Sequence, residues 1–490
     1  MSGVWQRHEV TLTADRDHED PVGSVHVEVE FRHESGTLAG AEAFWDGDRE
    51  WRVRFAPPLE GRWSWRSRCA QDAGLGGRSG EFACTAEAGA NPLYRHGAVR
   101  VAACGTHFEH ADGTPLFWLG DTAWNGPLKA GRAEWSRYLA DRAAKGFNAV
   151  QFVATSWLGA AGDAAGRRTH NGAAPLRIDP VYFRRLDWYV DAINDAGMLA
   201  APVLAWAAAW CHGALDLNPA TSLSDEALIL LARYLVCRYG AHHTAWILAG
   251  DGDYRGAAAE RWRRVGRAVF DRGDRLVSMH PGGKMWVAEE FANEPWFRFN
   301  GYQSGHWREE SERWIREGPP TRDWARTPRL PHINLEFCYE GHEDFIHHRR
   351  FDAADVRRAA WASVLATPPA GLSYGAHGIW SWESEPAHPM NHPTTGVAPA
   401  WTDALALPGS TCMRHLKELL ARVPWWRLRP WPELGTAART VAGDCAVVYL
   451  AEGGSVSIEG LRARCFDPAT GAPANDGPGD RLLLFTESKT

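Results

Sequence analysis

Apolar and polar side chains alternate with a period of two in the first part of the chain. The alternation is clear over residues 24–31, 50–55 and 62–67, and turn sequences containing Gly, Pro or Asp separate these runs. Such alternation predicts half-buried strands, and short strands with turns between them are typical of a β-sandwich. We therefore expect residues 1–88 to form an N-terminal β-sandwich.

After residue 88 the pattern changes to short apolar runs that alternate with helix-like segments. Eight runs are strand candidates, and they cover residues 116–120, 149–153, 199–204, 246–251, 275–279, 297–302, 333–336 and 378–382. Eight strand candidates in about 330 residues predict an α/β fold with a (β/α)8 TIM barrel over residues 89–422. A doubly wound parallel sheet is the alternative, but the phosphate-binding turn typical of that fold is missing.

The last part of the chain returns to strand-like runs. Residues 445–450 and 481–485 are mainly apolar, and the segments between them are rich in Gly, Pro and Asp. This pattern predicts a small C-terminal β domain over residues 423–490. Because a domain of this size buries little core of its own, we expect it to pack on the barrel.

Charge and composition exclude some classes of function. The chain has 53 basic and 60 acidic side chains and no basic block, which argues against nucleic acid and an anionic membrane surface as partners. No apolar run is long enough to predict a membrane-spanning helix. The nine cysteines are scattered and the N-terminus lacks the apolar core of a signal peptide. We therefore expect a cytoplasmic protein, or a secreted one if a leader has been removed.

Two of the apolar runs end in a carboxylate, Asp251 in one and Glu336 in the other. Because the carboxyl ends of barrel strands meet at one face, we expect the two side chains to lie together there. Such a pair can supply the acid/base and the nucleophile that cleave a glycosidic bond. The alternative is a pair of ordinary carboxylates in the loops that follow strands.

Other strand ends carry amides, imidazoles, carboxylates and aromatic rings, which suit a polyhydroxylated ligand such as a carbohydrate. The candidate binding residues are Asp121, Trp124, Gln151, Trp206, His280, Gln303, His306, Tyr339, Glu340, His377 and Trp380. Alternative roles remain for some of them: Asp121 could cap a helix, and His280 and His377 could be satisfied core histidines. Glu340 could be a loop charge.

Neither a metal ion nor a cofactor is expected. His342 and His347 are five residues apart, so they do not share a helical face as the two histidines of an H-E-x-x-H zinc helix do. The chain also has no P-loop and no G-x-S-x-G elbow, which argues against nucleotide binding and against serine hydrolase chemistry.

Several segments at the predicted strand ends resemble one family. They include FWLGDTAW at residues 117–124, WILAGD at 246–251, YQSGH at 302–306 and EFCYE at 336–340. These segments are similar to those of the apiosidase-like glycoside hydrolases, family 140 and its relatives. Residues 44–65 resemble the β-sandwich that often precedes that barrel, and the C-terminal part resembles the small β domain that often follows it.

The resemblance implies a function as well as a fold. By similarity, Asp251 is the acid/base and Glu336 the nucleophile of a retaining glycoside hydrolase. The implied substrate is a glycan or glycoside, for instance an apiosyl or arabinofuranosyl furanoside. Two other classes stay open: a non-catalytic glycan-binding protein, and a lyase or transglycosylase built on the same barrel.

Overall fold

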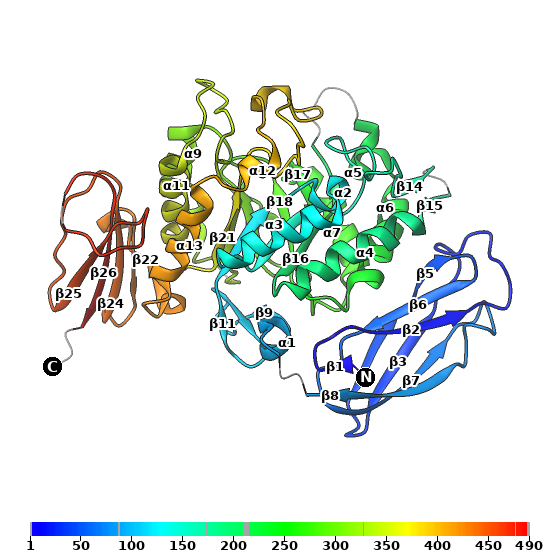
Figure 1. The fold of residues 1–490 in the computed structure, drawn as a ribbon. Coiled ribbons are helices and arrows are strands. Elements are labelled where there is room, and N and C mark those ends of the chain that lie inside the picture. The colour runs from blue at the N-terminus through cyan, green and yellow to red at the C-terminus, as the bar shows by residue number, and fades with distance from the viewer. Residues whose placement is uncertain are drawn as a thin grey trace.

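The computed structural model describes residues 2–86, 89–172, 175–208, 215–326, 328–475 and 477–487. Figure 1 shows three parts in chain order: blue sheets at the N-terminus, a central barrel of strands and helices, and an orange to red sheet at the C-terminus. The expected domain boundary at residue 88 lies outside the described residues. No helix among the described residues is long and apolar enough to cross a membrane.

The N-terminal part is a sandwich of two sheets. Its strands are β1 (Ser2–Gly3), β2 (His8–Thr13), β3 (Glu28–His33), β4 (Leu38–Glu42), β5 (Phe44–Gly47), β6 (Glu50–Phe55), β7 (Gly61–Arg68) and β8 (Ser79–Thr85). One sheet has the order β1-β8-β7-β3-β4 and the other the order β2-β6-β5. Phe31, Trp51, Val53 and Trp63 are buried in the core between them. The inward-facing residues of the alternating pattern therefore form this core, and the predicted sandwich is confirmed.

A short segment joins the sandwich to the barrel. It contains α1 (Pro92–His96) and a three-stranded sheet of β9 (Val99–Val101), β10 (Phe108–His110) and β11 (Pro115–Leu116). The ring of Phe108 lies 6.2 Å from that of Trp118 and 5.5 Å from that of Phe299, between ring centroids. Because both partners stand at the beginning of barrel strands, this sheet packs against the amino end of the barrel.

Eight parallel strands form the barrel. They are β12 (Trp118–Thr122), β13 (Ala149–Val153), β16 (Leu199–Trp206), β17 (Trp246–Gly252), β18 (Val277–Pro281), β19 (Asn300–Gln303), β20 (His332–Glu336) and β21 (Gly371–Gly375). Their order is β18-β17-β16-β13-β12-β21-β20-β19, so β12 pairs with β21, and β18 and β19 stand at the two ends of the order. Between β18 and β19, the Gly301 N–H donates to the hydroxyl of Ser278 at 2.8 Å. The predicted TIM barrel is therefore confirmed.

Helices surround the strands, as the cyan to orange ribbons in Figure 1 show. They are α2 (Gly126–Lys129), α3 (Arg132–Ala144), α4 (Pro180–Asp195), α5 (Pro219–Ser222), α6 (Asp225–Tyr239), α7 (Ala257–Val269), α8 (Ala288–Phe291), α9 (Arg308–Glu317), α10 (Pro319–Asp323), α11 (Ala353–Ala366), α12 (Trp401–Ala404) and α13 (Gly409–Leu420). Some begin at a polar cap: Asp179 accepts hydrogen bonds from two backbone N–H groups in the first turn of α4, and Ser224 accepts one from the Ala227 N–H in α6.

The eighth barrel strand is not where the apolar pattern predicted it. Residues 378–382 were expected to form it, but the strand is β21 and residues 377–382 form turns after it. Gly378 and Trp382 both have a positive φ, of 94° and 54°, which bends the chain away from an extended path. The apolar side chains of this segment are buried by packing instead. The ring of Trp382 stacks on that of Trp401, with 5.1 Å between ring centroids.

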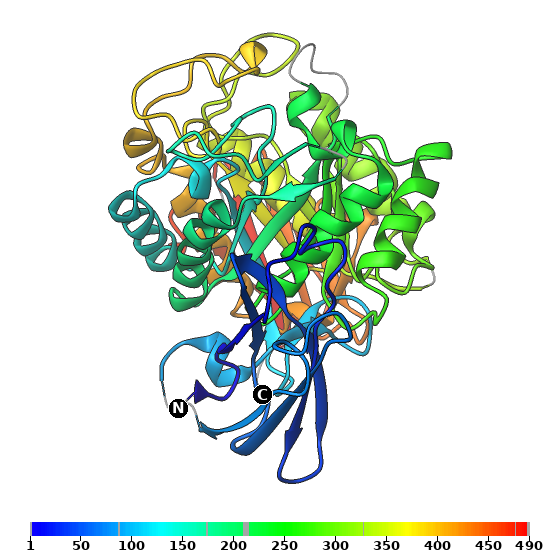
Figure 2. The same ribbon diagram turned by 90° about the vertical axis from the view of Figure 1, so that its right-hand side faces the viewer.

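Buried ion pairs join the sandwich to the barrel. Asp187 on α4 accepts from Arg54 on β6 at 2.6 Å and from Arg238 on α6 at 2.7 Å. Arg238 also donates to Asp46 of the sandwich at 2.8 Å. Both arginine side chains are almost fully buried. Figure 2 shows the blue sandwich held below the green helices that carry these residues.

The C-terminal sheet packs on the barrel, as predicted. It has the order β22-β23-β24-β26-β25, with β22 (Leu428–Pro430), β23 (Ala437–Thr440), β24 (Cys445–Leu450), β25 (Leu461–Phe466) and β26 (Arg481–Glu487). Arg357 on α11 pairs with Asp480 at 2.6 Å. Trp361 on the same helix stacks on Tyr449 of β24 at 6.0 Å.

Candidate active site

The barrel brings Asp251 and Glu336 to the same end, because they stand at the carboxyl ends of β17 and β20. The ladder between β17 and β18 is irregular around Gly250, and Asp251 adopts a φ of 52°, an uncommon conformation for a residue other than glycine. A bulge of this kind redirects a side chain at the end of a strand. The negative charge of Glu336 contributes to the raised pKa of Asp251.

The carboxylate of Glu336 is held by two histidines. Its Oε1 lies 2.9 Å from Nε2 of His306, and its Oε2 lies 3.4 Å from Nε2 of His280. Burial alone would raise the pKa of Glu336, but the two imidazoles outweigh that effect and lower the pKa to about 2. Glu336 is therefore ionised at neutral pH.

Asp251 is affected in the opposite direction. Burial, and then the negative charge of Glu336, raise its pKa well above the ordinary value of an aspartate. Two carboxylates whose environments move their pKa values apart are suited to different roles, one as an acid that carries a proton and the other as an anion. In this pair Asp251 has the environment of the acid and Glu336 that of the anion.

The hydrogen bonds of His306 establish which of its ring nitrogens carries the proton. The backbone N–H of Tyr339 donates to Nδ1 at 3.4 Å, so in the neutral ring Nε2 bears the hydrogen and donates to Glu336. The ring is also stacked on that of His342, with centroids 4.1 Å apart. His306 is therefore a fixed donor to the carboxylate rather than a free side chain at the mouth.

Tryptophan and histidine rings form a wall beside the two carboxylates. The ring of Trp124 lies 5.3 Å from those of Trp206 and His280, and Trp157 lies 4.4 Å from Trp206. Trp206 lies so close to Gly250 that a Cβ there would come within 2.5 Å of its ring. The predicted residues Trp124, Trp206 and His280 are thus brought together next to Asp251. Trp157, which stands four positions beyond β13, was not predicted.

Six candidate residues are buried and keep a polar atom without a hydrogen-bond partner among the described residues. The atoms are Oδ1 of Asp121, Oε1 of Gln151, Nε1 of Trp206, both ring nitrogens of His280, Oε1 of Gln303 and Oη of Tyr339. The Gln151 amide donates to Thr122 and to the Leu335 carbonyl, both at 2.7 Å, so its side chain lies inside the barrel. The Tyr339 hydroxyl lies near Glu336, whose charge, together with burial, raises the pKa of the tyrosine.

Asp121 and Glu340 were predicted to bind substrate, and the structure places both elsewhere. Asp121 Oδ2 accepts from Tyr138 at 2.8 Å and from Arg142 at 2.6 Å, so it faces the layer between β12 and α3. Nor does it cap a helix. Glu340 Oε2 accepts from the Tyr374 hydroxyl at 2.5 Å and from the first N–H of α13 at 2.8 Å. Because alternate positions point to opposite sides of a strand, a place near its end does not ensure that a side chain faces the mouth.

His377 and Trp380 are bonded to each other. Trp380 Nε1 donates to His377 Nδ1 at 3.0 Å, and His377 Nε2 donates to the carbonyl of Gly396 at 3.1 Å. Both ring nitrogens of His377 are therefore used within the protein, which matches the core-histidine alternative. The ring of Trp380 also stacks on that of His377, 6.0 Å between centroids, and lies 5.1 Å from that of His392 in an edge contact.

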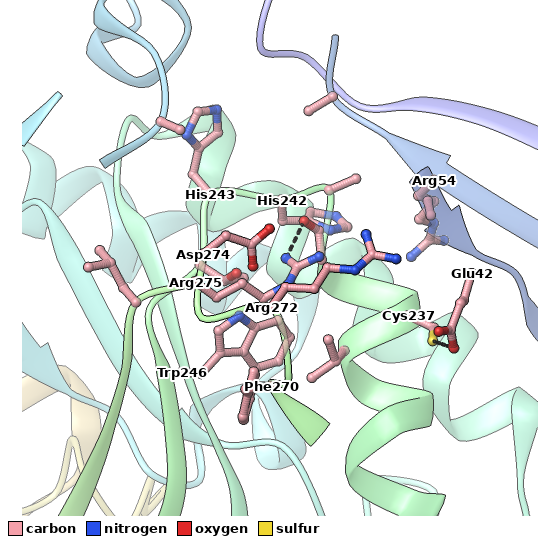
Figure 3. Close-up of a pocket in the computed structure, with 18 of the residues that line it drawn as sticks. Glu42, Arg54, Cys237, His242, His243, Trp246, Phe270, Arg272, Asp274 and Arg275 are labelled. Atoms are coloured by element: carbon pink, nitrogen blue, oxygen red, sulfur yellow. Dashed lines mark hydrogen bonds between the residues drawn. The ribbon is translucent and has the colours of Figure 1, made fainter. Parts of the chain in front are cut away.

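A cavity of about 350 Å³ lies at the other end of the barrel, between the sandwich and the beginning of β17. Figure 3 shows Arg272, Arg275, His242 and His243 around it, with Trp246 of β17 at its base. Arg272 donates to the Gly40 carbonyl at 3.2 Å, and Arg275 donates to that of Gly240 at 2.8 Å. The first of these bonds crosses from barrel to sandwich, so the cavity belongs to the domain junction and not to the carboxylate pair.

Among the described residues, no group of three or more His, Cys, Asp or Glu side chains is arranged to hold a metal ion. The polar groups next to Glu336 are two imidazoles, with Nε2 of His306 2.9 Å from Oε1 and Nε2 of His280 3.4 Å from Oε2. Asp251, with a raised pKa, and Glu336, with a lowered pKa, are the side chains here that can supply acid/base and nucleophilic chemistry.

Comparison with known proteins identifies the family of this chain. Residues 103–427 match the family described as "Apiosidase-like, catalytic domain", and residues 1–70 match a domain of unknown function, DUF5060. No match was found among curated protein sequences.

Solved structures of glycoside hydrolases share the fold. One superposes with a TM-score of 0.70 at 22% identity, over 81% of this chain and 98% of its own. A family 5 glycoside hydrolase from Bacteroides vulgatus gives 0.69 at 23% identity, over 81% and 94%. A protein from Bacteroides vulgatus provisionally assigned as a glycoside hydrolase gives 0.74 at 16% identity, over 99% of both chains.

Proposed function

The chain belongs to the apiosidase-like family of glycoside hydrolases, and we propose that it cleaves a glycosidic bond with retention of configuration, using Glu336 as the nucleophile and Asp251 as the acid/base. The observation that carries this proposal is the opposite displacement of the two pKa values, down for Glu336 and up for Asp251. A nucleophile must be ionised and a general acid must be protonated at the same pH.

In the first step, Glu336 attacks the anomeric carbon and the bond from that carbon to the leaving oxygen breaks. Asp251 gives its proton to that oxygen, so the leaving group departs as an alcohol and a glycosyl ester remains on Glu336. In the second step, the Asp251 carboxylate takes a proton from water while the water oxygen attacks the same carbon and releases Glu336. His280 and His306 stabilise the Glu336 carboxylate each time it is free.

The substrate that we propose is a furanoside, such as an apiosyl or arabinofuranosyl residue. The family supports this choice, and the side chains around the pair fit a sugar. Tryptophan rings can stack on its apolar face, and the open oxygens of Gln151 and Gln303 can accept hydrogen bonds from its hydroxyl groups.

A panel of para-nitrophenyl pentofuranosides and pyranosides, followed by nuclear magnetic resonance of the first product anomer, tests the proposal. We expect hydrolysis of a furanoside with retention. An inverted product would remove Glu336 as the nucleophile, and an unsaturated product that absorbs in the ultraviolet would indicate a lyase. Binding of the sugars with no turnover of any member would indicate a glycan-binding protein.

The pH profile depends on both carboxylates. Activity is expected to fall as pH rises through the elevated pKa of Asp251, because the acid is then deprotonated. On the acid side it should fall only as pH approaches about 2, where Glu336 gains a proton.

Asp251→Asn should lower the kcat for a poor leaving group roughly 10²- to 10⁴-fold. With an activated leaving group, which needs no proton, the rate of the first step in the variant should no longer fall at alkaline pH.

Asp253→Asn is the matched control, because Asp253 is exposed, lies two residues further on and bonds to Arg255. Its profile should equal that of the wild type. If Asp251→Asn kept the same alkaline limb with the activated substrate, Asp251 would not be the acid.

A further inference from the structure

His392 lies in the loop that follows the last barrel strand, a segment to which the sequence pattern assigned no role. Its ring is set between two tryptophans at the carboxylate end of the barrel. The centroid distances are 5.7 Å to Trp157 and 5.1 Å to Trp380. Trp157 in turn contacts Trp206, which packs on Gly250 next to Asp251. The imidazole is therefore part of the ring wall around the proposed acid and nucleophile.

The backbone of His392 is held firmly although it lies in a loop. Its N–H donates to the Pro389 carbonyl at 3.0 Å, and its carbonyl accepts from the Thr395 hydroxyl at 2.8 Å. The neighbouring Asn391 has a φ of 58° and donates from its amide to the Leu158 carbonyl at 2.6 Å, across to the loop after β13. These bonds give the imidazole a fixed position.

One ring nitrogen of His392 is used and the other is open. Nδ1 lies 2.7 Å from the Met390 carbonyl, which can only accept, so Nδ1 carries the hydrogen. Nε2 has no hydrogen-bond partner among the described residues. Burial lowers the pKa of His392, although the Met390 carbonyl and the charge of Glu336 oppose the change. The ring is therefore neutral at neutral pH, and Nε2 is an acceptor.

We propose that His392 is a specificity-determining residue whose Nε2 accepts a hydrogen bond from one hydroxyl group of the sugar that Glu336 attacks. This inference rests on the proposed function, and it adds a residue that selects the sugar by one hydroxyl position. A purely structural role, in which the ring only fills the space between Trp157 and Trp380, is the alternative that an experiment must separate from it.

His392→Phe keeps a ring between the tryptophans and removes the acceptor. The probe is a para-nitrophenyl pentofuranoside together with its monodeoxy analogues. In the wild type, loss of one particular hydroxyl should lower kcat/KM at least about tenfold. In His392→Phe the parent substrate should lose about the same factor, and the deoxy analogue should lose nothing further. His392→Gln, whose side-chain oxygen can take the place of Nε2, should recover part of the discrimination.

Thermal unfolding of His392→Phe should match the wild type within about 2 °C, since the ring volume is kept. If the variant discriminated against every deoxy analogue as the wild type does, the proposal would be wrong. If the wild type cleaved none of the glycosides, the proposed function would fail separately. Calorimetric titration of the free pentose and its deoxy forms would then decide: equal responses of wild type and His392→Phe would also overturn the role of His392.

Discussion

Replacing Glu336 with glutamine is expected to lower kcat roughly 10⁴- to 10⁶-fold while the protein keeps its fold. Glutamine has the same shape, and its carbonyl oxygen can still accept the hydrogen bond from His306. It has no negative charge and cannot form the ester with the sugar, so the first step is lost. The measurement is steady-state hydrolysis of the best furanoside from the panel, with thermal unfolding as the check on folding.

Glu340→Gln is the matched control, because the same change is made four residues later at another buried carboxylate. Glu340 bonds to the Tyr374 hydroxyl and to the beginning of α13. Its replacement should lower the free energy of unfolding by about 1–3 kcal/mol and leave kcat near the wild-type value. If Glu340→Gln abolished turnover and Glu336→Gln did not, the two glutamates would have been assigned the wrong way round.

Asp121→Asn is expected to lower the free energy of unfolding by about 3 kcal/mol. Arg142 is fully buried and stays charged, so the substitution removes its counter-charge and water cannot replace it. The loss falls at the lower end of the range for a broken buried ion pair, because Asp141 still bonds to Arg142 at 2.6 Å. Chemical denaturation measures the change.

Two comparisons separate this effect from a role in binding. The exposed pair of Asp253 and Arg255 should contribute no more than about 1 kcal/mol, so Asp253→Asn should be nearly neutral. In the Asp121→Asn background, Arg142→Met should recover much of the lost stability, since the uncompensated charge is gone. A rise in KM with unchanged stability in Asp121→Asn would instead indicate that Asp121 contacts the sugar.

The periodic parts of the fold were predictable from the sequence. The strand at residues 50–55 has the expected bounds, because burial of one face imposes a period of two that the residues show directly. The eighth strand was misplaced, because Gly371–Gly375 is short and rich in glycine whereas residues 378–382 are apolar. An apolar run indicates that a segment is buried, but a buried turn and a buried strand give the same pattern.

The direction of each side chain at the strand ends was less predictable. Asp121 and Thr122 are neighbours, yet Thr122 bonds to Gln151 inside the barrel and Asp121 bonds to α3 outside it. Neighbouring side chains of a strand point to opposite sides, but the sequence alone does not state which of the two faces the inside of the barrel. Partners distant in the chain, such as Arg142 and Tyr138, become visible only once the fold has formed.

The position of His392 was even less predictable from the sequence. Its loop has no hydrophobic period, and its position depends on single hydrogen bonds to Leu158, Pro389 and Thr395. No local pattern encodes such contacts. The candidate residues at strand ends were found because the barrel collects them at one end, and that rule does not extend to a long irregular loop.

The buried ion pairs between sandwich and barrel affect how this protein can be divided. A barrel produced alone would keep Arg238 without Asp46, and a sandwich produced alone would keep Arg54 without Asp187. Each arginine would keep one partner in its own half, Asp187 for Arg238 and Glu9 for Arg54, and would lose the partner in the other half. The two parts are therefore expected to be expressed and engineered as one unit.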